Sequence, residues 1–163
     1  MKVDIDNLKM ESTGKGEFPL FSFLEFRFFW SSPNGKAIPL LLGNPAWLAP
    51  LIAVPYMLVA LVYNLGGTRY FIRGENEVAG TVILKVRQDA LILQSVAVSP
   101  IKRKRGVGFF ALVHAEKLAK RMKLRWLELE VLKRNVPAQR LYWKFGFKIY
   151  AKRRLALVLR KRV

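Results

Sequence analysis

Between residues 98 and 108 the chain reads Val98-Ser99-Pro100-Ile101-Lys102-Arg103-Lys104-Arg105-Gly106-Val107-Gly108. The apolar run before this segment predicts a strand over residues 91–98 that ends at the proline. Helical spacing after it predicts a helix over residues 106–122, with one face lined by Leu112, Ala115, Ala119 and Met122. Glycines between a strand and a helix let backbone N–H groups approach a ligand, and a helix N-terminus favours an anion. The turn therefore suits a pyrophosphate, although a glycine pair in a purely structural turn is the alternative.

The elements around this turn predict a mixed α/β domain. Before it, Tyr70–Ile72, residues 78–86 with a bulge at Gly80, and residues 91–98 form an antiparallel meander. After it, residues 124–131 alternate as a strand with Leu127, Leu129 and Val131 on one side. A second helix follows Asn135 and stops at Gly146, and residues 147–151 and 155–159 make a closing hairpin.

Composition limits the class of protein and its chemistry. A chain of 163 residues is the size of one domain, and 52% hydrophobic with 25% charged residues indicates a globular fold. The absence of cysteine excludes disulfides, thiolate metal sites and cysteine nucleophiles. Helical spacing places the single histidine, His114, toward solvent. With one histidine and no cysteine, no catalytic metal is expected. The polar residues after Met1 do not resemble a signal peptide, which predicts a cytoplasmic location.

Charge is concentrated in the C-terminal part of the chain. The net charge is +18, and residues 101–163 contain 20 Lys and Arg against 3 Glu. Such a surface attracts nucleic acid, an anionic membrane or a phosphorylated cofactor. Charge alone does not choose among these partners.

The N-terminal third divides into a tail and an apolar segment. Residues 1–17 are expected to form a flexible tail, and residues 18–163 a single domain that begins with a strand over residues 18–30. Within the domain, residues 37–67 are an unusually apolar helical segment. Its most apolar part, residues 46–63, approaches the roughly 20 residues of a membrane span, but two prolines interrupt it. Core or lid helices are favoured, with a membrane-facing surface or a homodimer contact as alternatives.

Two motifs resemble the GNAT N-acetyltransferase superfamily. In that family a strand ending in Val-x-Pro leads into Arg/Gln-x-x-Gly-x-Gly/Ala, here Arg103-Lys104-Arg105-Gly106-Val107-Gly108. The segment Leu127-Glu128-Leu129-Glu130-Val131, followed by Asn135-x-x-Ala138-x-x-Leu141-Tyr142-x-x-x-Gly146-Phe147, is similar to ribosomal-protein alanine N-acetyltransferases. The resemblance covers residues 68–163. It implies the GNAT fold: a mostly antiparallel sheet with a V-shaped splay between strands 4 and 5, and helices on both faces.

The resemblance also implies the site. The loop over residues 103–108 would hold the pyrophosphate of acetyl-CoA, and the strand over residues 96–98 would pair with the pantetheine arm. Tyr142 would protonate the departing thiolate and Glu130 would be the base, with Glu128 as the fallback. The alternatives are a half-buried helix tyrosine and carboxylates in salt bridges. The implied cofactor-binding residues are Val96, Ala97, Val98, Arg103, Lys104, Arg105, Gly106, Val107, Gly108, Phe109, Asn135, Ala138 and Tyr142.

The predicted function is therefore an acetyl-CoA-dependent N-acetyltransferase. A primary amine, on a protein N-terminus or a small molecule, would attack the thioester directly in a ternary complex. The short turn at residues 152–154 is compatible with a peptide end as acceptor. Two alternatives remain: a non-enzymatic basic protein that binds nucleic acid or ribosomes, and a membrane-associated acyltransferase that uses longer acyl-CoA.

Overall fold

A computed structural model describes residues 7–14, 17, 24, 67–74 and 77–163. These residues form a seven-stranded sheet with the order β1-β2-β3-β4-β5-β7-β6. All neighbouring strands are antiparallel except β4 and β5, which are parallel. The strands are β1 (Lys9–Ser12), β2 (Thr68–Arg73), β3 (Val78–Arg87), β4 (Ala90–Val98), β5 (Trp126–Leu132), β6 (Lys148–Lys152) and β7 (Ala156–Arg162). The helices are the short 3₁₀ helix η4 (Pro100–Lys102), α4 (Val107–Arg121) and α5 (Val136–Lys144).

The predicted elements of the C-terminal two thirds are confirmed to within a few residues. The predicted bulge near Gly80 is present, because the register of β2 and β3 shifts between Ile72 and Arg73. One detail is wrong: Met122 does not line the buried face of the helix but is 45% exposed. The helix ends at Arg121, and Lys123 has a positive φ of 55°, so Met122 no longer follows helical periodicity.

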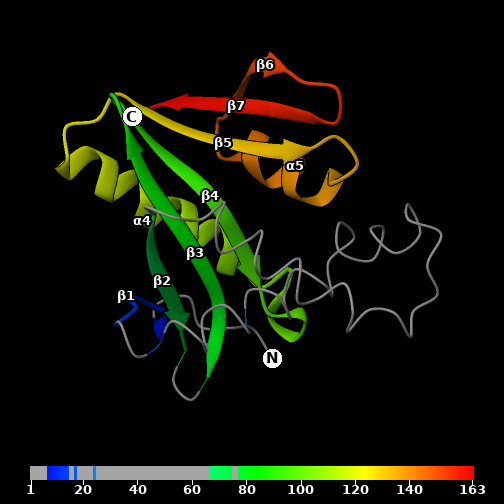
Figure 1. Ribbon diagram of the computed structural model, residues 1–163. Coiled ribbons are helices and arrows are strands. Elements are labelled where there is room, and N and C mark those ends of the chain that lie inside the picture. The colour runs from blue at the N-terminus through cyan, green and yellow to red at the C-terminus, as the bar shows by residue number, and fades with distance from the viewer. Residues whose placement is uncertain (1–6, 15–16, 18–23, 25–66, 75–76) are drawn as a thin grey trace.

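The two α-helices, α4 and α5, pack on the same face of the sheet (Figure 1). Apolar side chains of α4 and α5 share one core with alternate residues of β5 and β7, including Leu127, Leu129 and Leu159. The rings of Phe109 in α4 and Phe145 in α5 meet edge to face, with centroids 5.3 Å apart. The helices expected for the opposite face belong to the apolar segment over residues 37–67, nearly all of which lies outside the described residues.

The N-terminal predictions are partly corrected. The prediction of a flexible tail over residues 1–17 is wrong for Lys9–Ser12, which pair antiparallel with β2. Arg73 of β2 holds this segment through ion pairs with Glu11 (2.9 Å) and Glu17 (2.7 Å). These partners are about sixty residues apart in the chain, so local composition did not reveal the strand. The strand predicted over residues 18–30 lies outside the described residues except at Leu24, where the backbone is helical.

The predicted V-shaped splay is confirmed at the parallel pair. Strands β4 and β5 pair only from Ala90 with Trp126 to Leu93 with Leu129, and then separate (Figure 1). Beyond this point β4 stays bound to β3 as far as Val98, and β5 stays bound to β7 as far as Leu132. A register shift between β3 and β4 leaves Gln94 as an extra residue where the separation starts. The two strands therefore present their backbone edges to each other across a gap in the pairing.

The close approach of β3 and β4 is the basis of a stability prediction. A Cβ atom at Gly80 would lie 2.7 Å from the backbone oxygen of Ala97. We expect Gly80→Ala to lower the free energy of unfolding by about 1–3 kcal/mol, because neither backbone can move without breaking the ladder. Urea denaturation measures this change.

The matched control for this experiment is Gly74→Ala. A Cβ atom there would meet its nearest neighbour at 3.8 Å, which is ordinary contact. The control should change stability by no more than about 0.5 kcal/mol. Equal effects of the two substitutions would contradict the close approach at Gly80.

Candidate active site

The loop between β4 and α4 forms a group of backbone N–H donors. Lys104 and Gly106 have positive φ angles of 59° and 86°, in the left-handed region that favours glycine. The first helical hydrogen bond of α4 runs from the Phe110 N–H to the Gly106 oxygen at 2.9 Å. The N–H groups of residues 107–109 precede it and lack intrahelical partners. Turned N–H groups beside a positive helix end make a site for phosphate oxygens.

Arg103 connects this loop to the end of β4. Its Nε donates a hydrogen bond to the Val98 oxygen at 3.3 Å. Partial burial lowers the pKa of the Arg103 guanidinium through desolvation, although an arginine remains charged at neutral pH. The loop is fixed further by Lys102, whose ammonium pairs with Glu77 at 2.5 Å. Arg103 therefore holds the loop in place as well as contributing positive charge.

The start of α5 is tied to the end of β5 by two polar side chains. The Asn135 Oδ1 accepts a hydrogen bond from the Ala138 N–H at 3.3 Å and caps the helix. The Gln139 Nε2 donates to the backbone oxygens of Leu132 (3.0 Å) and Lys133 (2.6 Å). Gln139 is 6% exposed. Sequence reasoning missed this positioning residue, because a glutamine in a helix carries no signal of burial.

Tyr142 lies one turn further along α5 and is buried in the helix-side core. Its ring meets Phe147 edge to face, with centroids 5.9 Å apart. Burial raises the pKa of Tyr142 to about 12. The phenol is therefore fully protonated at neutral pH.

The two carboxylates of β5 project from the other face of the sheet. Leu129 and Val131 belong to the helix-side core, so Glu128 and Glu130, which alternate with them, point the opposite way. The Glu130 Oε2 pairs with Arg153 in the β6–β7 turn at 3.1 Å, and the Glu130 side chain is 40% exposed. The Glu128 Oε2 pairs with Arg160 Nε at 2.5 Å, and the Glu128 side chain is only 16% exposed. Both carboxylates thus make the salt bridges that were the structural alternative.

The splay connects these two faces. The N-terminus of α4 approaches α5 so closely that a Cβ atom on Gly108 would lie 2.9 Å from the Leu141 side chain. The loop, Asn135 and Tyr142 are therefore on the helix side, whereas Glu130 is on the opposite side. The unpaired edges of β4 and β5 lie between them. A ligand that enters from the helix side can meet a second ligand at the gap.

The single histidine, His114, is not part of this site. His114 is half-buried rather than turned to solvent, and its ring contacts that of Phe110 at a tilt of 37°, with centroids 4.0 Å apart. Among the described residues, no group of three or more His, Asp or Glu is placed to hold a metal ion. Within the same residues, no helix is long and apolar enough to cross a membrane.

Sequence comparison identifies the family. The family model described as "Acetyltransferase (GNAT) family" matches residues 48–147, which is more than half of the chain. The chain belongs to the GNAT acetyltransferase family. No curated protein sequence shows a significant match.

Solved GNAT structures share the fold. The chain is similar to the PaiA N-acetyltransferase of Thermoplasma acidophilum in complex with coenzyme A, with a TM-score of 0.74, 16% identity and coverage of 96% of this chain and 99% of that one. It is similar to the ribosomal-protein-S18-alanine N-acetyltransferase of Escherichia coli, with a TM-score of 0.68, 18% identity and coverage of 96% and 94%. An acetyltransferase of Bacillus subtilis in complex with CoA has a TM-score of 0.66, 18% identity and coverage of 96% and 99%. At these identities the likeness establishes a common fold.

The burial of Tyr142 in this GNAT domain predicts a change in alkaline stability. The tyrosine of the unfolded chain loses its proton near pH 10, whereas the folded one keeps it to about pH 12. Between these values the unfolded state binds fewer protons, so the free energy of unfolding falls as pH rises, by about 1.4 kcal/mol per pH unit. Tyr142→Phe removes this contribution. Urea denaturation at pH 8 and pH 11 should therefore show the wild type losing more stability than the variant.

The matched control is Tyr150→Phe, which removes the phenol of a side chain that is 61% exposed. Loss of the same alkaline stability in wild type and Tyr142→Phe would contradict a buried neutral phenol at position 142.

Proposed function

We propose that this GNAT protein transfers an acetyl group from acetyl-CoA to a primary amine. The observation that carries the proposal is the position of the N–H-rich loop at the end of β4, the strand whose backbone edge is unpaired beyond Leu93. A pyrophosphate at the loop and an extended arm along β4 are compatible with these donors. The CoA complexes of the neighbours from T. acidophilum and B. subtilis support this ligand.

The proposed cofactor contacts come from residues already placed on the helix side. The N–H groups of residues 104–109 would bind phosphate oxygens, with Arg103 and Arg105 adding charge. Residues 96–98 would offer backbone hydrogen bonds to the pantetheine arm. The side-chain oxygen of Asn135 caps α5, so its side-chain NH2 group would donate to the same arm. Acetyl-CoA would supply a thioester whose carbonyl carbon an amine can attack. A backbone N–H of β4 near the gap would stabilise negative charge on the carbonyl oxygen.

The high pKa of Tyr142 disfavours complete proton transfer from this phenol to the leaving thiolate. An ordinary thiol titrates near pH 8.5, whereas burial raises the pKa of Tyr142 to about 12. Complete proton transfer from this phenol to a thiolate would be uphill by roughly 3.5 pKa units, or about 5 kcal/mol. A hydrogen bond from the protonated hydroxyl to the leaving sulfur carries no such cost. We therefore assign Tyr142 as a hydrogen-bond donor to the departing thiolate, which would leave as the anion and take its proton from water after release, while the proton lost by the amine goes to Glu130.

Glu130 is the better of the two candidate bases. Its Oε2 pairs with Arg153 in a half-exposed position, so the pair contributes little stability and leaves Oε1 free to accept a proton. Glu128 is more buried and held by Arg160, which in turn stacks on Tyr150 with the guanidinium carbon 3.7 Å from the ring centroid. Releasing Glu128 would break this whole arrangement. Glu130 would take the amine proton directly or through water.

A protein N-terminus is the acceptor that we favour. The likeness to the ribosomal-protein-S18-alanine N-acetyltransferase and the short β6–β7 turn beside Glu130 support this choice. The turn is closed against β5 by a hydrogen bond from the Lys133 N–H to the Leu155 oxygen at 3.0 Å. A chain end approaching from this side would meet the base before the gap.

Ligand-induced stabilisation tests the proposed cofactor. At a concentration a hundred times Kd, acetyl-CoA should raise the free energy of unfolding by about 2.7 kcal/mol, and the melting temperature by roughly 5–10 °C. The double variant Arg103→Ala, Arg105→Ala should lose most of this shift. The control is Lys117→Ala, Arg121→Ala, which removes two exposed cations of α4. An unchanged melting temperature of the wild type at millimolar acetyl-CoA would refute the proposal.

Kinetics test the assignment of the base. Thiol release from acetyl-CoA would be measured with a panel of peptides that carry free N-termini. Glu130→Gln should lower kcat/KM by about 10²–10⁴, the usual contribution of a general base. Glu128→Gln is the matched control and should have the smaller effect. The reverse order of the two effects would transfer the role to Glu128.

A further inference from the structure

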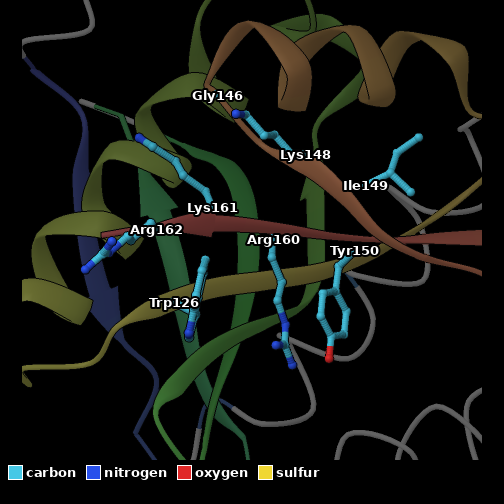
Figure 2. A pocket seen from close by; sticks show the side chains of 8 residues that line it. All are labelled: Trp126, Gly146, Lys148, Ile149, Tyr150, Arg160, Lys161 and Arg162. Carbon is cyan, nitrogen blue, oxygen red and sulfur yellow. The ribbon is translucent and has the colours of Figure 1, made fainter.

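A basic hollow lies at the end of the C-terminal hairpin. The pairing of β6 with β7 reaches Lys148 and Arg160, and β7 continues two residues further, to Arg162. The hollow at this end has a volume of about 490 Å³ and is lined by Trp126, Gly146, Lys148, Ile149, Tyr150, Arg160, Lys161 and Arg162 (Figure 2). Four of these residues are cationic and none is acidic. The volume lies within the range of small-ligand sites, so the hollow can hold a group the size of a nucleotide.

Two aromatic rings flank a guanidinium on one side of this hollow. Trp126, Arg160 and Tyr150 come from β5, β7 and β6, and their side chains point to the same side of the hairpin, away from α5 (Figure 2). Arg160 lies over the Tyr150 ring at 3.7 Å, and its charge is balanced by Glu128. Tyr150 is nevertheless 61% exposed. The row therefore presents flat, partly exposed surfaces on which a planar ring can stack.

The cations around the row are of two kinds. Arg160 and Lys161 are committed to ion pairs, with Glu128 and with Glu116. In the part of the chain that the structure describes, Lys148 and Arg162 have no acidic partner within ion-pair distance. Exposed Arg125, next to Trp126, extends the positive charge beyond the hollow. Figure 2 shows the Lys148 side chain extending toward α5, opposite to the row, so it can neutralise a phosphate at the rim of the hollow, while Arg162 and Arg125 can do so beside the row.

We propose that this surface, made by Trp126, Lys148, Tyr150, Arg160 and Arg162, binds single-stranded nucleic acid. Aromatic rings beside a cationic groove are the combination that holds single strands without reading their sequence. A membrane surface is less suited, because it is met by protruding apolar side chains, whereas these rings line a hollow. The surface is separate from the N–H-rich loop and from Tyr142, but it adjoins the acceptor face, because Tyr150 and Arg160 also line a second hollow with Glu128 and Arg153. The proposal rests on ring exposure and charge alone and does not depend on acetyl transfer.

Fluorescence anisotropy of labelled oligo(dT) and oligo(U) of about 12 nucleotides tests it. Wild-type protein should bind both, more weakly at about 200 mM than at 50 mM salt. Tyr150→Ala should weaken binding roughly five- to a hundredfold, the loss of one base stack, whereas Tyr150→Phe should keep the affinity. Melting temperatures with and without acetyl-CoA show that each variant is folded, and they test the proposed cofactor separately.

Charge-matched variants distinguish a defined binding site from nonspecific electrostatic attraction of the oligonucleotide to a basic protein. Lys148→Glu and Lys117→Glu change the net charge equally, but Lys117 is an exposed residue of α4 outside the hollow. Lys148→Glu should weaken binding about tenfold more than Lys117→Glu. Equal effects, or unchanged affinity of Tyr150→Ala, would overturn the proposal. So would failure to bind either oligonucleotide, and binding to phosphatidylserine vesicles in its place would assign the surface to membranes.

Discussion

The parallel pairing of β4 with β5, which ends after Leu93 and Leu129, is the constraint on which the site depends. Each strand is secured on its other side, β4 by β3 and β5 by β7, so neither can close the gap without losing an existing ladder. The bulge at Gln94 allows β4 to turn away where the pairing stops. An unpaired strand edge is normally a liability, but in the proposed function it would supply backbone donors and acceptors to the cofactor.

The packing of α4 and α5 on one face of the sheet places the candidate site residues on two different sides. Their shared core places the N–H-rich loop and Tyr142 on the helix side, and the period of two in β5 sends Glu130 to the other. In the proposed reaction the acetyl donor and the amine acceptor would therefore reach the gap from opposite faces of the sheet. Asn135 and Gln139 fix the first turn of α5, and Tyr142 follows one turn after Gln139.

The positive charge of residues 101–163 is only partly neutralised by ion pairs, and the remainder lies at more than one place on the surface. All three glutamates of residues 101–163 are paired, Glu116 with Lys120 and Lys161, Glu128 with Arg160 and Glu130 with Arg153. Lysines and arginines far outnumber these acids, so most of the excess remains on the surface. Part of it belongs to the loop before α4, and part surrounds the aromatic row of the C-terminal hairpin. The two locations suit different anions: a compact pyrophosphate at backbone donors, and an extended polyanion beside stacked rings.

The sequence by itself determined the order of the elements from residue 68 onward and the GNAT fold, because periodicity, glycines and prolines act over a few residues. The motif around Arg103–Gly108 also located the loop and its helix. Tertiary structure decided the pairing of Lys9–Ser12 with β2, the burial of Gln139 and the ion pairs that hold Glu128 and Glu130. It also assembled Trp126, Tyr150 and Arg160 into one row. These features join residues that are distant in the chain, and local composition does not predict which distant residue a side chain will contact.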